Sequence, residues 1–480
     1  MKIGQYILSL DQGTTSSRAV LFDALGGIAG MGQREFTQIY PQPGYVEHDA
    51  VEILQTQLYA MRQAVHEAEI TAEDIAAISI TNQRETTVAW DSETGIPICN
   101  AIVWQCRRTA PECERLIAEG LEEYIHKTTG LIIDPYFSGT KMKWILDNVP
   151  KAKVLAKEHR LRFGTIDTWL IYSLTEGESY VTDVTNASRT MLFDIQKLDW
   201  DEKMLNVFGI PRDALPKVVD SSGVVGMCSE TILGRKIPIA GIAGDQHAAL
   251  FGQCCFDKGM AKNTYGTGCF VLMNTGDKPV FSDRGLITTI GWCVNGETTY
   301  ALEGSAFNAG SAIKWLRDEL KLIANPQEAD LLAETVEDAG GALLGVTRGT
   351  SKAHICRAVL ESIAYESYDL VKAMEAGSGT EISELRVDGG ASRSRFLMQY
   401  QADLLHCAVR QPKCLETTAL GSAMLAGLAV GVWESLDELR TVWKLKNAYD
   451  PQTAAGSEEK ALKRWHKAVE RSMGWADGLD

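Results

Sequence analysis

Apolar runs typical of β-strands alternate along this chain with longer runs that have helical spacing. Strand-like runs occur at 6–10, 19–22, 75–81 and 237–243, whereas Ser305 to Ile323 and Lys352 to Glu375 look helical. Strands and helices that alternate in this way predict an α/β architecture.

The first two strand-like runs flank a tight turn that is rich in hydroxyl groups and glycine, within the segment Tyr6 to Phe22. Backbone N–H groups and hydroxyls at such a turn can bind phosphate oxygens, Asp11 can hold Mg²⁺ and Arg18 can neutralise phosphate charge. The segment lacks the Gly-x4-Gly-Lys-[Ser/Thr] pattern of a P-loop. Taken alone, it is equally consistent with an ordinary hairpin that has a polar turn.

Two later segments have a related build. Gly259 to Met273 is again strand, Gly/Thr turn and strand, and Leu385 to Ser392 is a strand that ends in a glycine pair, with a helix expected from about Ser394. Glycine at the end of a strand lets the backbone approach a ligand closely. Two phosphate-type hairpins, one in each half of the chain, therefore predict ATP bound between two similar domains.

Polar pairs follow two of the predicted strands: Arg84 and Glu85 after 75–81, and Asp245 and Gln246 after 237–243. In α/β folds, ligand groups lie just past the carboxyl ends of strands. Carboxylates accept hydroxyl hydrogens and Arg and Gln donate to hydroxyl oxygens, so these residues suit a polyol, and a carboxylate can take the proton of an attacking alcohol. Two structural alternatives remain open: a surface ion pair for Arg84 and Glu85, and a helix N-cap for Asp245.

Composition narrows the class of protein. The 480 residues exceed one core, so two domains are expected, 1–252 and 253–480, with a boundary near Gly252–Asp257. The net charge of −16 argues against nucleic acid or anionic membranes as partners. The eleven cysteines show no metal-ligand spacing, and no signal peptide or membrane span is recognised, which predicts a soluble cytoplasmic protein.

Two apolar patterns near the end of the chain predict helices. The run from Ala423 to Trp433 is too short to cross a bilayer and suits a buried helix. The tail from Glu458 to Trp475 has apolar residues at helical spacing and a basic opposite face. A docked C-terminal helix is favoured over a membrane-surface helix.

Several longer motifs carry a family resemblance, which extends from Tyr6 almost to the C-terminus. The chain resembles the carbohydrate kinase family with the actin-like, ribonuclease-H-like fold, and within it the enzymes that phosphorylate glycerol. The motifs are Leu10 to Arg18, Thr81 to Thr87, Val103 to Arg108, Tyr136 to Trp144, Gly244 to Gln246, Asn263 to Cys269 and Gly341 to Glu361.

The resemblance implies two such α/β domains around an ATP and substrate cleft, and an ATP:glycerol 3-phosphotransferase that makes sn-glycerol 3-phosphate in glycerol catabolism. It implies Asp245 as the general base, Asp11 as the Mg²⁺ residue, and a homodimer or homotetramer. Glycerol would be bound by Arg84, Glu85, Trp104, Tyr136, Asp245, Gln246 and Phe270. ATP would be bound by Thr14, Thr15, Ser16, Arg18, Thr267, Gly310 and Gly390, with Lys314 and Ser394 also at nucleotide positions.

The sequence departs from the family pattern in four places. Lys314 replaces a usual Gln and Ser394 a usual Asn, and the loop Met227 to Arg235 lacks the glycines that bind fructose 1,6-bisphosphate in some bacterial members. Near Gly341, a strand and loop of about twenty residues are missing. Either the sheet edge is rebuilt in a natural short variant, or the C-terminal domain is impaired.

Three functions are therefore compared. Glycerol kinase activity is favoured by the two polar pairs together. A related sugar kinase, acting on a ketose such as xylulose, should not need the Asn82 to Glu85 pattern. A catalytically impaired ATP-binding member, such as a regulator or chaperone, is favoured only by the missing segment.

Overall fold

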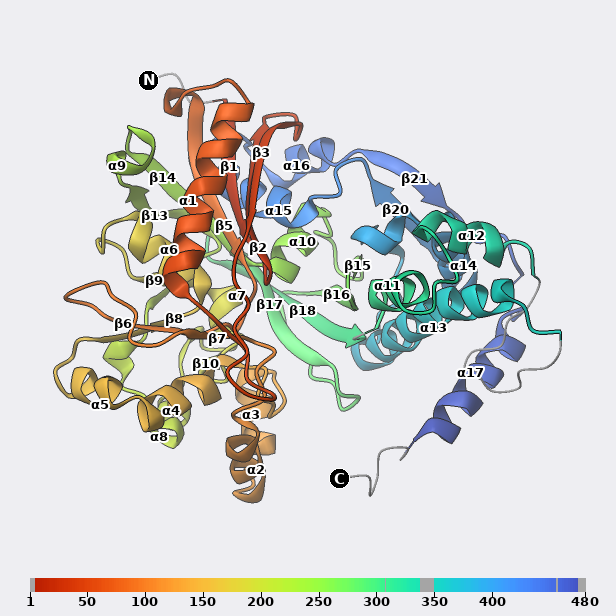
Figure 1. Ribbon diagram of the computed structural model, residues 1–480, viewed down its shortest axis with the longest axis horizontal. Coiled ribbons are helices and arrows are strands. Elements are labelled where there is room, and N and C mark those ends of the chain that lie inside the picture. Colours follow the sequence, from red (N-terminus) through yellow and green to blue (C-terminus); the bar gives the residue numbers. More distant parts are fainter. Residues whose placement is uncertain (1–4, 307, 337–348, 455, 474–480) are drawn as a thin grey trace. The chain divides into compact units, whose positions relative to one another are not determined.

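The computed structural model describes residues 5–306, 308–336, 349–454 and 456–473, and its elements are labelled in Figure 1. The chain divides into two compact units. The first unit comprises 1–258, 274–302 and 416–443, and the second unit comprises 259–273, 303–415 and 444–480. The two strands β16 (Cys269–Gly276) and β18 (Glu297–Ala306) contribute residues to both units.

The first unit is built on a sheet with the strand order β18-β17-β13-β14-β5-β1-β2-β3. The strands β1 to β3 form an antiparallel meander, whereas β1, β5 and β14 are parallel neighbours. Their bounds are β1 Tyr6–Gln12, β2 Ser16–Asp23, β3 Ile28–Glu35, β5 Ile75–Asn82, β13 Ser222–Cys228, β14 Ile237–Gly244 and β17 Ile287–Val294.

Helices cover both faces of this sheet because its strands are apolar on both sides. Leu8 and Leu10 of β1 belong to an apolar core that also contains residues of α1 (Ala50–Glu67) and α6 (Ile166–Leu174). Ser9 points to the opposite face, since successive side chains alternate, and its hydroxyl bonds Ser422 of α15 (Thr417–Val430) at 2.9 Å. Figure 1 shows α1 running beside β3.

The helix α15 lies unusually close to its neighbours. A Cβ atom at Gly421 would stand 1.8 Å from the carbonyl oxygen of Ala248 in α10 (Asp245–Gly252), and one at Gly252 would stand 2.1 Å from that of Thr417. Glycine at these positions therefore permits the tight crossing of α10 and α15. This crossing fixes the start of α10, where Asp245 lies.

A second apolar core in the first unit supports the loops after the sheet. It is formed by short helices and two-stranded sheets. The helices of this core are α2 Ala110–Ala118, α3 Glu122–Thr129, α4 Ser138–Asn148, α5 Pro150–Lys157, α7 Val184–Ala187 and α8 Glu202–Phe208. Two other short helices of the first unit are α9 (Glu230–Leu233), which packs against the first core, and α16 (Leu436–Val442). The strand pairs are β4 Glu47–His48 with β7 Ala101–Ile102, β6 Val88–Asp91 with β8 Leu161–Gly164, β9 Val181–Asp183 with β12 Lys217–Val219, and β10 Phe193–Asp194 with β11 Asp199–Trp200.

The second unit repeats the hairpin arrangement of the first. The strand β15 (Ala261–Tyr265) pairs antiparallel with β16 and parallel with β19 (Glu384–Asp388), as β1 pairs with β2 and β5. The sheet continues through β20 (Ala408–Pro412) to β21 (Leu445–Tyr449). Its helices are α11 Gly310–Asp318, α12 Pro326–Ala333, α13 Lys352–Ser378, α14 Arg395–Leu405 and α17 Glu459–Ser472.

Most predicted elements are confirmed, including both hairpins, the strand before the glycine pair and the helix that follows Ser394. The tail is a docked helix: the ring of Trp465 stacks on Tyr365 of α13, with ring centroids 5.4 Å apart. The expected helix from Ser305 to Ile323 is wrong at both ends, because β18 continues to Ala306 and α11 spans only Gly310–Asp318. The run from 305 to 309 reads Ser-Ala-Phe-Asn-Ala, and this pattern does not separate a strand end from a helix start.

Two further predictions bear on chain organisation. The missing strand and loop near Gly341 fall among residues 337–348, which lie outside the described residues. No helix within the described residues is both long and apolar enough to cross a membrane.

Candidate functional site

The parallel strands β1, β5 and β14 end side by side. In their register Asp11 is level with Thr81, and Asn82 is level with Gly244. The predicted polar residues Arg84 and Asp245 come directly after β5 and β14. The fold therefore brings three charged residues from distant parts of the sequence to one edge of the first unit's sheet.

Arg84 lies at the centre of this group and is buried. Its Nε atom is 3.2 Å from Oδ1 of Asp245 and 3.8 Å from Oε1 of Glu85, and its Nη2 donates to the Tyr136 hydroxyl at 3.1 Å. Only 3% of Arg84 and 1% of Glu85 are exposed, so the alternative of a surface ion pair is wrong. Burying these charges is costly, and the cost is offset here by mutual pairing.

Asp245 is the first residue of α10, and the N-cap residue is Gly244. Its Oδ1 atom accepts a hydrogen bond from the backbone N–H of Gln246 at 2.7 Å. The structure therefore does not support the alternative of a helix N-cap. The side chain is 31% exposed, unlike that of Arg84, so its carboxylate remains accessible to a ligand.

An aromatic pair lies beside Arg84. The rings of Trp104 and Tyr136 meet edge to face, with centroids 5.5 Å apart. The indole Nε1 of Trp104 donates to Oγ1 of Thr14 at 3.0 Å, which joins the predicted polyol wall to the first phosphate hairpin. Phe270, the third aromatic residue predicted for this wall, lies on β16 in the second unit and is level with Thr264.

The first hairpin places Asp11 directly opposite Arg18. The Arg18 guanidinium forms an ion pair with Glu416, just before α15. Burial raises the pKa of Asp11 to about 6; Arg18 opposes this shift, while the charges of Glu416 and Asp245 add to it. A carboxylate oxygen is a ligand that Mg²⁺ prefers in proteins.

The hydroxyl residues of the first turn are held by the backbone and by neighbouring side chains. Gly13 N–H donates to the carbonyl of Ser16 at 3.1 Å, and the amide of Gln38 donates to the carbonyl of Thr14 at 3.1 Å. The Ser16 hydroxyl accepts a hydrogen bond from Gln33 at 3.0 Å, whereas Thr15 is exposed. These bonds fix the backbone of the turn and the side chain of Ser16.

In the second unit, three glycine-bearing segments meet at the second hairpin. Gly310 N–H donates to the carbonyl of Gly266 at 3.0 Å, and the carbonyl of Thr267 accepts from Ser311 N–H at 3.2 Å. A Cβ at Gly389, whose φ is +84°, would stand 2.6 Å from the carbonyl oxygen of Tyr265. A Cβ at Gly390 would meet nothing within 4 Å, so this residue borders open space.

Lys314 and Ser394, the two atypical residues at predicted nucleotide positions, differ in their surroundings. Lys314 is exposed on α11. Ser394 is the N-cap of α14: its hydroxyl accepts from Leu397 N–H at 3.0 Å and donates to Oδ1 of Asp330 at 2.6 Å. Ser394 therefore has a structural role that its position after the glycine pair did not predict.

Three charged residues at the first unit's group were not singled out from the sequence. Arg189 donates to Oε1 of Glu85 at 2.6 Å, and Glu416 pairs with Arg18. The third residue, buried Lys141, donates to the backbone carbonyls of Pro135, Tyr136 and Phe137. Burial lowers the pKa of Lys141 to about 8, against the opposing charge of Glu85. One feature of the sequence could have pointed to Arg189, because it is the only charged residue from 184 to 193.

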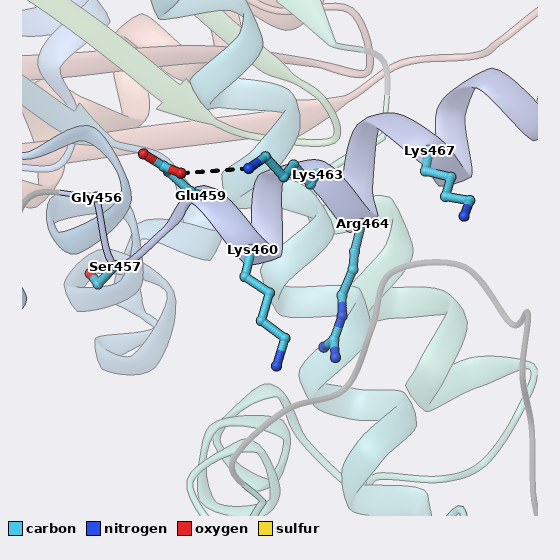
Figure 2. Close-up of a pocket in the computed structure, with 7 residues that line it drawn as sticks. All are labelled: Gly456, Ser457, Glu459, Lys460, Lys463, Arg464 and Lys467. Carbon is cyan, nitrogen blue, oxygen red and sulfur yellow. Dashed lines mark ion pairs between the residues drawn. The ribbon is translucent and has the colours of Figure 1, made fainter.

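Two hollows lie along α17, and neither is lined by any residue predicted for the site. One is lined mainly by basic side chains, which Figure 2 shows along one side of the helix: Lys460, Lys463, Arg464 and Lys467. The other is largely apolar and includes Trp315, Val359 and Trp465. Within the described residues, no group of three or more His, Cys, Asp or Glu side chains is arranged to hold a metal ion.

Sequence comparison gives matches over nearly the whole chain. The profile of the FGGY family of carbohydrate kinases, N-terminal domain, matches residues 6–252. That of the C-terminal domain matches in two pieces, 261–339 and 335–430, which overlap shortly before Gly341, near which a strand and loop are expected to be missing. Glycerol kinase 2 of Thermotoga maritima is 54% identical over 98% of this chain and 99% of its own, as is the glycerol kinase of Paraburkholderia phytofirmans.

Solved structures agree with this assignment. The glycerol kinase of Plasmodium falciparum, solved with ADP, is 36% identical over 98% of both chains, with a TM-score of 0.92. A xylulose kinase of Lactobacillus acidophilus shares the fold, with a TM-score of 0.87 at 22% identity over 98% of this chain and 99% of its own. The chain belongs to the FGGY family of carbohydrate kinases.

Proposed function

We propose that this protein is a glycerol kinase, which transfers the γ-phosphoryl group of ATP to a terminal hydroxyl of glycerol and releases ADP and sn-glycerol 3-phosphate. The observation that carries the proposal is the buried group around Arg84, in which one guanidinium joins Glu85, Asp245 and Tyr136. Full-length relatives at 54% identity that are named glycerol kinases support it.

The group offers the donors and acceptors that a small polyol needs. The carboxylates of Glu85 and Asp245 accept hydroxyl hydrogens, while Arg84 and Gln246 donate to hydroxyl oxygens. Trp104 and Tyr136 supply apolar surface for the carbon chain, and the resemblance assigns the same role to Phe270. Because Glu85 and Arg84 are already paired and buried, glycerol binds to groups that need little reorganisation.

Asp245 acts as the general base. Its side chain is partly exposed, and the neighbouring Arg84 holds the carboxylate at 3.2 Å. In this role it orients the attacking hydroxyl and takes its proton as the bond to phosphorus forms.

ATP is bound by backbone groups and small residues. Thr14, Thr15, Ser16 and Arg18 of the first hairpin and Thr267 of the second contact phosphates, whereas Gly310, Lys314, Gly390 and Ser394 border the nucleoside. The open space at Gly390 supports this role, because a base or ribose packed there would exclude any side chain.

Mg²⁺ fits the carboxylate-rich surroundings of Asp11, whose raised pKa reflects burial and the charges of Glu416 and Asp245. Asp11 would hold the ion. A bound magnesium ion supplies charge neutralisation on the phosphates. The cytoplasmic location and the homodimer or homotetramer implied by the resemblance stay predictions.

A coupled ADP-release assay across glycerol, xylulose, ribulose and gluconate tests the proposal. The expected result is the highest kcat/KM on glycerol. A higher kcat/KM on any of the sugars would favour the related sugar kinase. ATP binding without turnover of any substrate would favour the impaired member that the missing segment near Gly341 suggested.

A further inference from the structure

We infer that Arg189 is a positioning residue for the polyol site, which holds Glu85 and Tyr136 in place so that Arg84 remains with Asp245. This inference rests on the proposed function, because it names a further determinant of the same site. Arg189 contacts Glu85 and Tyr136, its backbone is fixed by neighbouring elements, and Arg84 pairs with both Glu85 and Asp245.

Arg189 contacts two residues predicted to bind glycerol. Its Nε donates to Oε1 of Glu85 at 2.6 Å, and its guanidinium lies 5.6 Å from the ring centroid of Tyr136 and 5.3 Å from that of Phe137. The residue is completely buried. A buried guanidinium needs a paired carboxylate, and Glu85 provides one here.

The backbone around Arg189 is fixed by hydrogen bonds to several elements. Asp183 caps α7 by accepting from the N–H groups of Thr185 and Asn186. The side chain of Asn186 accepts from Asn82 at the end of β5, at 3.0 Å. The carbonyl of Thr190 accepts from Gly139 N–H of α4 at 2.7 Å. Arg189 is therefore held from both β5 and α4, which flank the site.

Arg84 is divided between two carboxylates, at 3.2 Å from Asp245 and 3.8 Å from Glu85. Glu85 is completely buried, and its backbone has a φ of +59°. If Arg189 were removed, Arg84 would be the nearest remaining guanidinium for the buried carboxylate. We therefore expect Glu85 to draw Arg84 away from Asp245, which would misplace both groups for the polyol.

The test compares Arg189→Lys with a matched control, Arg108→Lys. Arg108 has the same local chemistry as Arg189: it is buried, donates to Glu47 at 2.7 Å, and lies over the rings of Tyr45 and Trp144. Both variants keep the positive charge but lose the planar guanidinium group and its paired N–H donors. We expect Arg189→Lys to raise the KM for the polyol at least roughly tenfold, with KM for ATP within about threefold of wild type. Arg108→Lys should leave both KM values within about threefold.

A double variant shows whether Arg189 acts through Glu85. If it does, Arg189→Lys combined with Glu85→Gln should raise the polyol KM no more than the larger of the two single effects. The inference would be overturned if the two single effects on the polyol KM multiplied in the double variant. It would also be overturned if Arg189→Lys and Arg108→Lys had the same polyol KM. A general loss of packing would instead change both variants and both KM values alike.

The polyol used is the one that the wild-type protein phosphorylates best in the substrate panel. If that polyol is a sugar, the proposed function fails while the effect of Arg189 is still measured with that sugar. If the wild type phosphorylates no polyol, both the proposed function and this inference are overturned.

Discussion

The two units present different kinds of chemical group at their candidate sites. In the first unit, buried and charged side chains, Arg84, Glu85 and Arg189, are paired with one another. In the second unit, glycines and backbone carbonyls meet at the β15–β16 turn, and Gly390 borders open space. If the proposed function holds, the difference teaches that fixed hydrogen-bonding groups would select a small polyol, whereas the shape of a glycine-lined surface would select a nucleoside.

The largest expected effect tests the charged group in the first unit. Asp245→Asn keeps the size and one hydrogen-bond acceptor but removes the base, so kcat on glycerol should fall by at least about 100-fold, with a smaller change in KM for ATP. Steady-state kinetics with both substrates measure this. Asp49→Asn is the control, since Asp49 caps α1 and Asn is an equally good cap.

A folded Asp245→Asn variant with near-normal kcat would show that Asp245 is not the base. A variant that unfolds would instead indicate that the start of α10 depends on the carboxylate. Thermal unfolding of the same preparation separates these two results.

The next prediction concerns pH and the carboxylates around Asp11. Because the pKa of Asp11 is raised from 3.8 to about 6, its ionised form is lost as pH falls through 6 rather than through 4. If the ionised form holds Mg²⁺, kcat/KM for ATP at limiting Mg²⁺ should fall by about tenfold per pH unit below pH 6. Asp11→Asn should lower the plateau and remove this acid limb. If the acid limb of the pH profile stayed at the same pH in Asp11→Asn, it would belong to another titrating group.

A smaller effect is expected at Ser394, where the second unit uses a side chain. Ser394→Ala removes the N-cap of α14 and should lower the free energy of unfolding by about 1 kcal/mol. Ser394→Asn restores a capping residue and should cost only a few tenths of a kcal/mol. Chemical denaturation of both variants measures this. Equal losses in the two variants would mean that capping is not the main role of Ser394.

Much of the fold could be predicted from local patterns. The hairpins Tyr6 to Phe22 and Gly259 to Met273 combine strand-type runs with turn residues, so pattern and turn chemistry agree. The predicted start of the helix at Ser305 was wrong because the residues at the end of the strand resemble those at the start of the helix. The N–H of Ala309 donates to the carbonyl of Thr267 in the β15–β16 turn, and no local sequence pattern contains this contact.

The candidate site was less predictable than the fold. Motifs pointed to Arg84, Glu85 and Asp245, and the strand register explains why they meet. Arg189 and Glu416 were missed because each is 100 or more residues away in sequence from its partner. The capping role of Ser394 was also hidden, since its second partner, Asp330, lies on a different helix.

The most direct test of the contrast between the units measures KM for glycerol and for ATP in two variants, Glu85→Gln and Gly390→Ala. We expect opposite effects of the two variants on the two KM values. Glu85→Gln should raise KM for glycerol about tenfold or more and leave KM for ATP nearly unchanged, and Gly390→Ala should do the reverse without loss of stability. If both variants raised the same KM, or if Gly390→Ala left KM for ATP unchanged, the division of labour between charged side chains and glycines would be contradicted.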